Sequence, residues 1–158
     1  MNVDRVDRAI ISELSQDSRL SIRELAGRVH ISRTSAHNRV QRLIADGVLS
    51  GFVATVDRKA LGLHVTAIVI VKVGDVVWSD LAQALAELPY VENVQAVSGD
   101  IDFVLTVSAP DHERLSEVIM RQIHAMPGVV STRSHVVLDE HPGTAPGVMM
   151  DVWPVQAP

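Results

Sequence analysis

Apolar residues in the first fifty positions recur with the 3.6-residue period of amphipathic helices, and this pattern predicts three helices. The first is expected from Asp4, which can cap its N-terminus, to Asp17. The second opens at the capping box Ser21–Glu24 and runs for about eight residues. The third opens at Ser32 and stops at Asp46-Gly47. The side chains expected to face inward are Val6, Ile10, Ile11, Leu14, Ile22, Leu25, Ala26, Val29, Ala36, Val40, Leu43 and Ile44.

The spacing of apolar residues changes from helical to extended after Gly47. Residues 48–56 are expected to form a small wing and a linker strand, with Gly51 at a turn. Residues 57–62, Asp-Arg-Lys-Ala-Leu-Gly, then mark the boundary of a second domain.

The second domain has the pattern βαββαβ, which is the element order of a ferredoxin-like fold. The expected strands are 65–73, 91–97, 101–108 and 129–138, and the expected helices are 79–88 and 111–125. Together with the helical first domain, this order predicts the α+β fold class.

The first strand of this domain is apolar on both faces, because Ile68 and Ile70 alternate with the apolar residues around them. Two helices in this fold cover only one face of the sheet, so the other face needs a second cover. Either the chain's own wing or Pro-rich tail supplies it, or another subunit does. We favour another subunit, since a 158-residue chain with two minimal cores gains stability by association.

The formal net charge of −5 argues by itself against a nucleic-acid partner, but this charge is unevenly distributed. Residues 1–50 hold eight Arg and six acidic residues, a net charge of +2, and the remainder holds a net charge of −7. No Lys occurs in the first fifty residues, and the planar donor fork of Arg suits phosphates and guanine edges. This asymmetry indicates a charged partner for the first domain.

The third helix carries a polar, acid-poor surface opposite its apolar stripe. A short second helix, a tight turn and such a third helix are typical of a helix-turn-helix, whose last helix enters the major groove of DNA. Asn and Gln can read adenine there, and Arg can contact guanine or phosphate. The alternative is an ordinary solvated face, which would also recruit Glu and Lys. The candidate DNA-binding residues are Ser32, Arg33, Thr34, Ser35, His37, Asn38, Arg39, Gln41 and Arg42.

These patterns divide the chain into four parts. A winged helix-turn-helix domain is expected over residues 1–50, a wing and linker strand over 51–62, and a ferredoxin-like domain over 63–140. Residues 141–158 form a Pro/Gly-rich tail that contains Trp153. This tail is expected either to lie over a neighbouring subunit or to be disordered.

The cysteine count and the apolar runs bear on the compartment. The chain has no Cys, which excludes disulfides, thiolate nucleophiles and Cys-based zinc sites. Its first residues do not form a basic lead followed by an apolar core, and its longest apolar run, 67–71, is far too short to span a bilayer. We therefore expect a cytoplasmic protein with no membrane partner.

An enzyme or a metal protein is the alternative from another functional class. The seven His residues include no i, i+4 pair, and the chain has neither an HExxH motif nor a Gly-rich phosphate loop. We therefore expect no catalytic residue, no metal and no cofactor.

Short motifs in both halves of the chain match one known family. In the first half they are Val3-Asp4-Arg5-Val6-Asp7, Ile10 to Leu14, Leu25-Ala26, Ile31-Ser32, Arg39 to Leu43 and Gly47-Val48. In the second half they are Val97 to Phe103, Pro127 to Val129, Thr132 to Ser134 and Val136 to Leu138. Together they resemble the Lrp/AsnC family of feast/famine transcriptional regulators over residues 3 to about 140. One departure is His30, where the family usually has Gly, although His tolerates a left-handed turn better than most residues.

The resemblance implies that the second domain binds an effector, an amino acid or a related small metabolite, in crevices between subunits. It also implies dimers, often assembled into rings such as a tetramer of dimers. The candidate effector-binding residues are Ser98, Gly99, Asp100, Asp102, Thr132 and Ser134. Gly99 would let the backbone approach a ligand closely, and the carboxylates could accept hydrogen bonds from an α-ammonium group. The alternative is an ordinary hairpin turn at Gly99-Asp100 and a solvated strand residue at Asp102.

The predicted function is therefore that of a transcriptional regulator that binds double-stranded DNA at a two-fold operator and responds to an effector. A nucleoid-associated location in a bacterial or archaeal cytoplasm follows from this prediction. The alternative is a metabolite-sensing oligomer that does not bind DNA.

Overall fold

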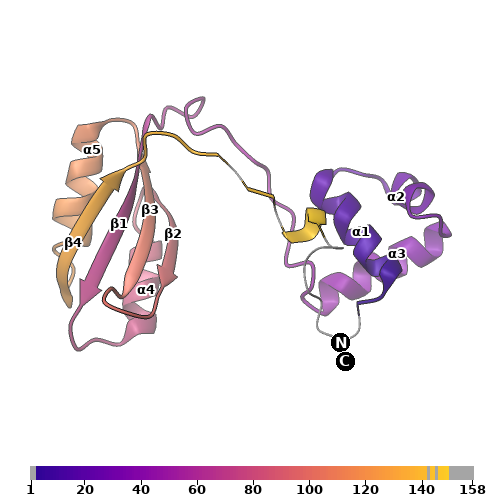
Figure 1. Cartoon of the computed structure of the whole chain (residues 1–158), viewed down its shortest axis with the longest axis horizontal. Coiled ribbons are helices and arrows are strands. Elements are labelled where there is room, and N and C mark those ends of the chain that lie inside the picture. The colour runs from indigo at the N-terminus through magenta and orange to yellow at the C-terminus, as the bar shows by residue number, and fades with distance from the viewer. Residues whose placement is uncertain (1–2, 142, 145, 150–158) are drawn as a thin grey trace. The chain divides into compact units, whose positions relative to one another are not determined.

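The computed structural model describes residues 3–141, 143–144 and 146–149 (Figure 1). The described chain divides into two compact units. Unit 1 comprises residues 3–54 together with the described residues from His141 onward, and unit 2 comprises residues 55–140. The elements of unit 1 are α1 (Arg5–Gln16), α2 (Ile22–Arg28), α3 (Arg33–Ala45) and the short 3-10 helix η2 (Pro146–Met149). Those of unit 2 are β1 (Val65–Val73), α4 (Trp78–Ala86), β2 (Val91–Ala96), β3 (Phe103–Ala109), α5 (His112–Glu117), the π-helix η1 (Val118–Ile123) and β4 (Val129–Val136).

Each helix of the N-terminal bundle begins at the cap that the sequence predicts. In α1 the backbone N–H of Asp7 donates to Oδ1 of Asp4 at 2.8 Å, and the backbone N–H of Asp4 donates back to Oδ2 of Asp7 at 3.1 Å. The Ser21–Glu24 capping box opens α2 in the same reciprocal way. At α3 the backbone N–H of Ser35 donates to Oγ of Ser32 at 3.2 Å. These bonds satisfy donors that every helix N-terminus leaves open, and they fix the starting point of each helix.

Two left-handed residues delimit α3. His30, in the turn between α2 and α3, has φ 55°, so this side chain occupies the turn conformation for which the family usually employs Gly. Gly47 has φ 71° directly after the C-cap of α3, where a residue without Cβ is favoured.

The bundle core forms from the apolar stripes of the three helices. The buried apolar residues are Ile10, Ile11, Leu14, Leu25, Ala26, Ala36, Val40 and Leu43. The expectation that Ile44 faces inward is wrong, because its side chain is 42% exposed. Ile44 lies one step around the helix from Leu43, at the edge of the stripe, and three short helices cover only the centre of that stripe.

The expected wing and linker strand over 48–56 is not formed. The described chain has neither helix nor strand between Ala45 and Val65. A strand needs a hydrogen-bonding neighbour, and among the described residues of this chain the segment has no strand partner. Its apolar side chains are accordingly exposed, with Val53 at 90% and Val56 at 61%.

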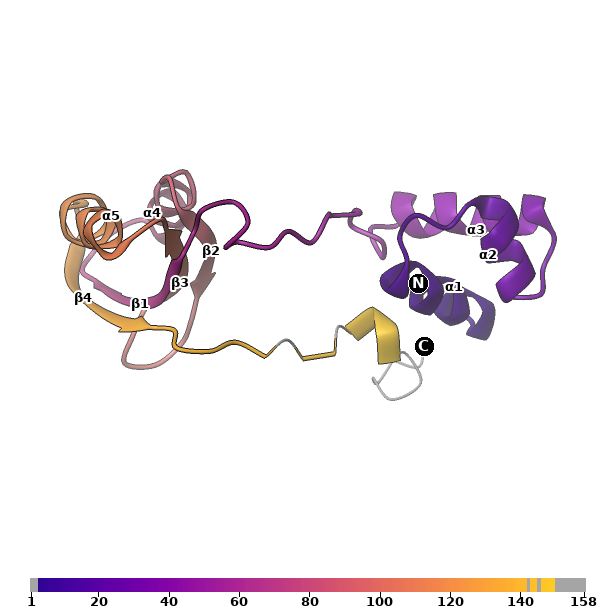
Figure 2. The same cartoon turned by 90° about the horizontal axis from the view of Figure 1, so that it is seen from above.

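Unit 2 is an antiparallel four-stranded sheet in the order β2-β3-β1-β4, and its elements follow one another as βαββαβ, as predicted. The helices α4 and α5 lie on one face of this sheet (Figure 2). Val69 and Val71 of β1, which lie on that face, are fully buried in a core with Leu85, Phe103 and other apolar residues of the sheet and helices. The helix predicted over 111–125 is continuous in position, but it changes from α to π geometry after Glu117.

The opposite face of the sheet has no helix over it within this unit. Ile68 and Ile70 project from β1 on this face, paired with Thr106 and Val104 of β3. All four are only partly buried. The prediction that the sheet has a second apolar face is therefore confirmed, whereas its cover is not part of the described unit.

The described part of the tail returns to the N-terminal helices of its own chain. The hydroxyl of Ser12 in α1 donates to the carbonyl oxygen of Val148 at 3.3 Å. A Cβ on Gly147 would meet Oγ of Ser15, so η2 lies close against α1. Trp153 lies outside the described residues. Among the described helices, none combines the length and the apolar composition that a membrane crossing needs.

Candidate functional site

The outer face of α3 is open to solvent, as its phase predicts. Thr34, His37, Asn38 and Gln41 are exposed, and so is Arg33 in the first turn. Thr34, Asn38 and Gln41 are exposed because they lie on the side of the helix opposite Ala36, Val40 and Leu43, which are buried. His37 lies on the flank of this face. Arg33 is exposed because it lies in the first turn, although its phase is close to that of the buried stripe.

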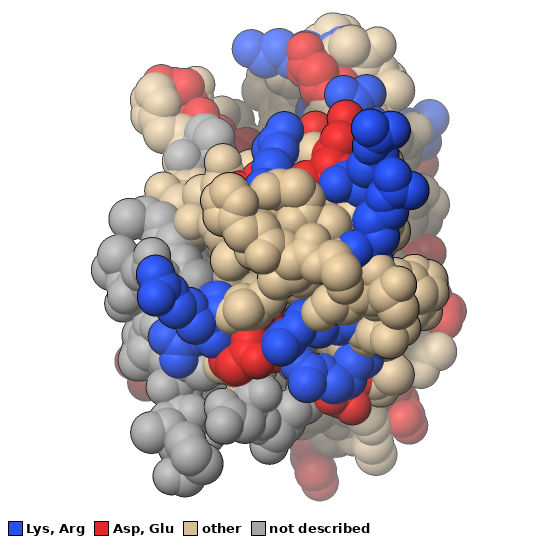
Figure 3. Space-filling view, turned by 90° about the vertical axis from the view of Figure 1, so that its right-hand side faces the viewer, with Lys and Arg blue, Asp and Glu red and all other residues tan. Residues whose placement is uncertain are grey.

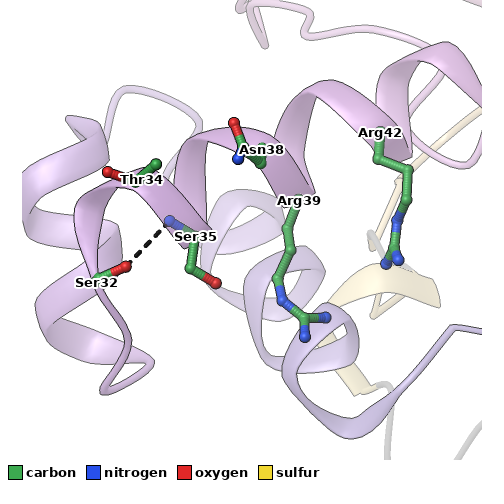
Figure 4. A pocket seen from close by; sticks show the side chains of 6 residues that line it. All are labelled: Ser32, Thr34, Ser35, Asn38, Arg39 and Arg42. Carbon is green, nitrogen blue, oxygen red and sulfur yellow. Dashed lines mark hydrogen bonds between the residues drawn. The ribbon is translucent and has the colours of Figure 1, made fainter.

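A shallow concavity of about 500 Å³ runs along this face (Figure 4). Its lining is hydroxyl, amide and guanidinium, supplied by Ser32, Thr34, Ser35, Asn38, Arg39 and Arg42. Six of the nine predicted DNA-binding residues therefore share one surface. Arg33, His37 and Gln41 lie on the same helix but outside this concavity.

Two of the predicted DNA-binding arginines are already paired within the protein. Nη1 of Arg39 donates to Oδ2 of Asp4 at 2.7 Å and to Oδ1 of Asp7 at 2.8 Å. Nη2 of Arg42 donates to Oδ2 of Asp7. Both arginine side chains extend from α3 in the same direction (Figure 4). The guanidinium groups thus join α3 to the first turn of α1, a role that the sequence did not suggest.

These pairs shift the pKa values of the groups involved. The backbone N–H of Asp7, followed by the hydrogen bond from Arg39, holds the pKa of Asp4 below its usual value. The hydrogen bonds to Asp4 and then Asp7 raise the pKa of Arg39. At neutral pH the guanidinium and the Asp4 carboxylate are therefore both charged.

Other arginines of unit 1 keep their charge open to solvent. Arg5, Arg23 and Arg33 are exposed, and within the described residues none of them forms an ion pair. Figure 3 looks onto this unit and shows Arg side chains around an uncharged surface, with acidic groups lying between some of them. Positive charge that is free to meet phosphate therefore comes from Arg33 on α3 and from helices α1 and α2.

The predicted effector residues fall into two places. Ser98, Gly99 and Asp100 form the exposed turn between β2 and β3, and Gly99 has φ 121°. The carboxylate of Asp102 accepts a hydrogen bond from the backbone N–H of Val73 at 2.8 Å. Asp102 therefore ties the turn to the end of β1, in addition to any contact with a ligand.

Thr132 and Ser134 lie on β4, at the other edge of the sheet. Val71 of β1 pairs with Thr132 of β4 on one side and with Phe103, the first residue of β3, on the other. Thr132 therefore lies two strand spacings, or about 10 Å, from the start of β3. The Thr132 hydroxyl is 3.2 Å from Nδ1 of His124. One chain alone does not bring Thr132 and Ser134 together with the β2–β3 turn.

Two further residues belong to these regions, and sequence reasoning missed both. Trp78 stands at the start of α4 with its ring 5.3 Å from that of Phe103, beside the β2–β3 turn. No motif pointed to it. Asp7 could have been found, because it is an acidic residue on the apolar stripe of its helix, three positions before Ile10 and seven before Leu14.

Comparison with known proteins identifies both units. A family model described as winged helix-turn-helix DNA-binding matches residues 3–50, and a model of the Lrp/AsnC ligand binding domain matches residues 66–145. The HTH-type transcriptional regulator FL11 of Pyrococcus horikoshii is 31% identical over 142 residues, which cover 90% of this chain and 93% of FL11. The leucine-responsive regulatory protein of Klebsiella pneumoniae is 31% identical over 142 residues, covering 88% of this chain and 87% of that protein.

Solved structures agree with these matches. LrpC of Bacillus subtilis superposes with a TM-score of 0.82 at 30% identity, covering 91% of this chain and 100% of LrpC. A feast or famine regulatory protein from M. tuberculosis, solved with L-methionine, gives a TM-score of 0.83 at 29% identity, covering 90% and 96% of the two chains. On the strength of both domain matches, this chain belongs to the Lrp/AsnC family.

Proposed function

We propose that this protein is a sequence-specific DNA-binding transcriptional regulator whose DNA affinity or oligomeric state responds to an amino acid or a related small metabolite. The observation that carries the proposal is the solvent-exposed, acid-free outer face of α3. In a helix-turn-helix this face lies in the major groove.

The exposed side chains suit particular roles in that groove. Asn38 and Gln41 carry amides that can pair with the N6 and N7 edge of adenine, and Thr34 can contact a base or a thymine methyl group. Arg33 has no ion-pair partner among the described residues, and its guanidinium can reach guanine or phosphate. Arg39 and Arg42 are tied to α1, so the amides and Arg33 are the first candidates for reading sequence.

The DNA-binding proposal is tested in two steps. Fragments bound by the wild-type protein are selected from genomic DNA, and the recovered site is then titrated with variants. Asn38→Ala and Gln41→Ala should each weaken operator binding by about 1–3 kcal/mol if the lost contact is to a base. Gln16→Ala is the matched control, because Gln16 is an exposed helical glutamine of the same unit at the end of α1. Equal affinities for all four proteins would argue against reading by α3.

The effector proposal rests on the β2–β3 turn and on the family. A related protein was solved with L-methionine, and the Lrp/AsnC ligand-binding model matches residues 66–145, which include all the helices and most of the strands of unit 2. Gly99 and the carboxylates of Asp100 and Asp102 offer a flexible backbone and acceptors for an ammonium group. Because Thr132 and Ser134 are remote from this turn in one chain, we propose that a second subunit completes the pocket.

The open sheet face and the linker support an oligomer. Within the described part of unit 2, no helix covers Ile68, Ile70 and Val104. Phe52, Val53 and Val56 of the linker are exposed. A second copy of the chain would bury the sheet face and give the linker a strand partner. We propose a dimer that reads a two-fold operator, with assembly into a ring such as a tetramer of dimers, in the cytoplasm and in association with the nucleoid.

The internal pairing of Arg39 and Arg42 favours a second candidate function. A metabolite-sensing oligomer without DNA binding would also neutralise its arginines in this way. It predicts that selection recovers no enriched genomic fragment, with or without added amino acids.

A further inference from the structure

Asp7 is a fully buried carboxylate beside a surface that otherwise faces solvent. Its oxygen Oδ1 accepts from Arg39 at 2.8 Å. Its oxygen Oδ2 accepts from the backbone N–H of Asp4 at 3.1 Å and from Arg42. This carboxylate therefore holds two guanidinium groups of α3 and one helix N-terminus at once.

Asp4 completes the cluster from the surface. Its oxygen Oδ2 accepts from Nη1 of Arg39 at 2.7 Å, and its side chain is 46% exposed. The four charges of Asp4, Asp7, Arg39 and Arg42 sum to zero. Arg39 and Arg42 therefore add no net positive charge to the α3 surface, because Asp4 and Asp7 balance their charges.

This neutrality matters for DNA that is not the operator. Binding to arbitrary sequence depends on the number of cations that displace counterions from phosphates, whereas base contacts distinguish one sequence from another. A guanidinium that is already bonded to a carboxylate displaces counterions poorly, since the carboxylate repels the phosphate.

We infer that Asp7, together with Asp4, is a specificity-determining residue of this unit: the two carboxylates suppress sequence-independent binding by Arg39 and Arg42. Recognition is thereby left to the side chains that face the bases. The inference rests on the proposed DNA-binding function and adds a role for two acidic residues that do not themselves face the groove.

The cleanest variant is Asp4→Asn. Asn caps a helix about as well as Asp, so the change removes one charge from the cluster and retains the N-cap of α1. We expect about fivefold tighter binding to a labelled duplex of mixed sequence at about 0.1 M salt, and a log–log salt slope more negative by about one.

Asp7→Asn should act in the same direction and more strongly, because it removes the carboxylate that Arg42 bonds and leaves Arg39 with Asp4 alone. We expect about tenfold or tighter binding to the same duplex and a slope more negative by up to about two. For both variants the ratio of operator affinity to mixed-sequence affinity should fall. Circular dichroism establishes whether Asp7→Asn is folded. If Asp7→Asn does not fold, the affinity and salt slope of Asp4→Asn alone test the role of the carboxylates.

Asp17→Asn is the matched control. It changes the net charge of the protein by the same amount at the other end of α1, about 15 Å along the helix axis from Asp7. We expect at most about a twofold effect on binding to the mixed duplex, because a charge at this distance is largely screened by salt.

The outcomes separate this inference from the proposed function. Wild-type protein that binds no duplex even at low salt would overturn DNA binding itself. Wild-type protein that binds, with Asp4→Asn identical to it or to Asp17→Asn in affinity and salt slope, would overturn the role of the carboxylates and leave DNA binding intact.

Discussion

The candidate DNA-binding site on α3 and the candidate effector site at the β2–β3 turn of unit 2 differ in one respect. A single chain brings together the residues of the first site but not those of the second. The candidate DNA-reading residues lie within eleven consecutive positions of one helix and its N-cap, so local helix geometry is enough to bring them together. The candidate effector residues come from a hairpin turn and from β4, with β3 and β1 between them. A short-range pattern therefore builds the first site, whereas the second depends on what packs against the sheet.

The largest effect should come from a substitution on the open face of the sheet, where we propose that a second subunit completes the effector site. Ile68→Glu places a charge on the open sheet face, and burying it unpaired in a dimer interface costs about 4 kcal/mol. Sedimentation should then detect monomers, and calorimetry should detect no effector binding. Ser116→Glu, on the exposed side of α5, is the control and should remain associated. A dimeric Ile68→Glu variant would show that this face is not the interface.

A core substitution should break the first site and spare the second. Leu43 is fully buried in α3, and Leu43→Ala should destabilise the helical unit by about 3 kcal/mol. Amide hydrogen exchange should accelerate in α1, α2 and α3 and remain unchanged in β1, β3 and β4, because each unit has its own core. Equal acceleration in both units would mean that the two cores unfold as one.

The sequence predicted the elements that depend on local signals. Caps at Asp4, Ser21 and Ser32 and the stop at Asp46-Gly47 are local signals, and they located the three helices within a residue or two. The apolar runs that predict the four strands are also local signals, and they located all four strands along the chain.

Predictions that needed a distant partner were less successful. The prediction of a linker strand over 48–56 was wrong because a strand requires a neighbour, and the described part of this chain provides none. Ile44 was wrong because burial at the edge of a helical stripe depends on what lies opposite. The pairing of Arg39 and Arg42 with Asp7 spans more than thirty residues, so helical phase placed the two arginines at the rim of the outer face and gave no hint of their partner.

Removing the charge of Asp102, beside the β2–β3 turn, should have a smaller effect on effector binding. Asp102→Asn keeps an acceptor for the N–H of Val73 but removes the negative charge, and it should weaken binding of an amino acid by about 1.5 kcal/mol. Calorimetry with each of the twenty amino acids measures this change. Glu113→Gln, which removes an exposed charge from α5, should bind as the wild type does. Equal effects of both substitutions would point to overall charge instead of a contact at Asp102.

The smallest effect concerns pH and unit 2. Hydrogen bonds from Arg58 hold the pKa of Glu92 below its usual 4.5, and Arg58 also bonds Glu140 at 2.6 Å. Because the folded pKa of Glu92 is depressed, its contribution is present above about pH 4.5 and is lost as pH falls through the folded value. The partly exposed pair should contribute less than about 1 kcal/mol. Urea unfolding at pH 7 and at pH 3 should show a smaller pH-dependent loss for Glu92→Gln than for the wild type.

The most direct test of the central claim uses the absence of cysteine from the chain. Asn38→Cys and Gln16→Cys each introduce a single thiol, one on the outer face of α3 and one at the end of α1, and each thiol can carry a photoactivated cross-linker. We predict that the label at position 38 cross-links to bases of the selected operator and that the label at position 16 does not. Cross-linking from position 16 with none from position 38 would contradict the conclusion that α3 is the helix that reads DNA.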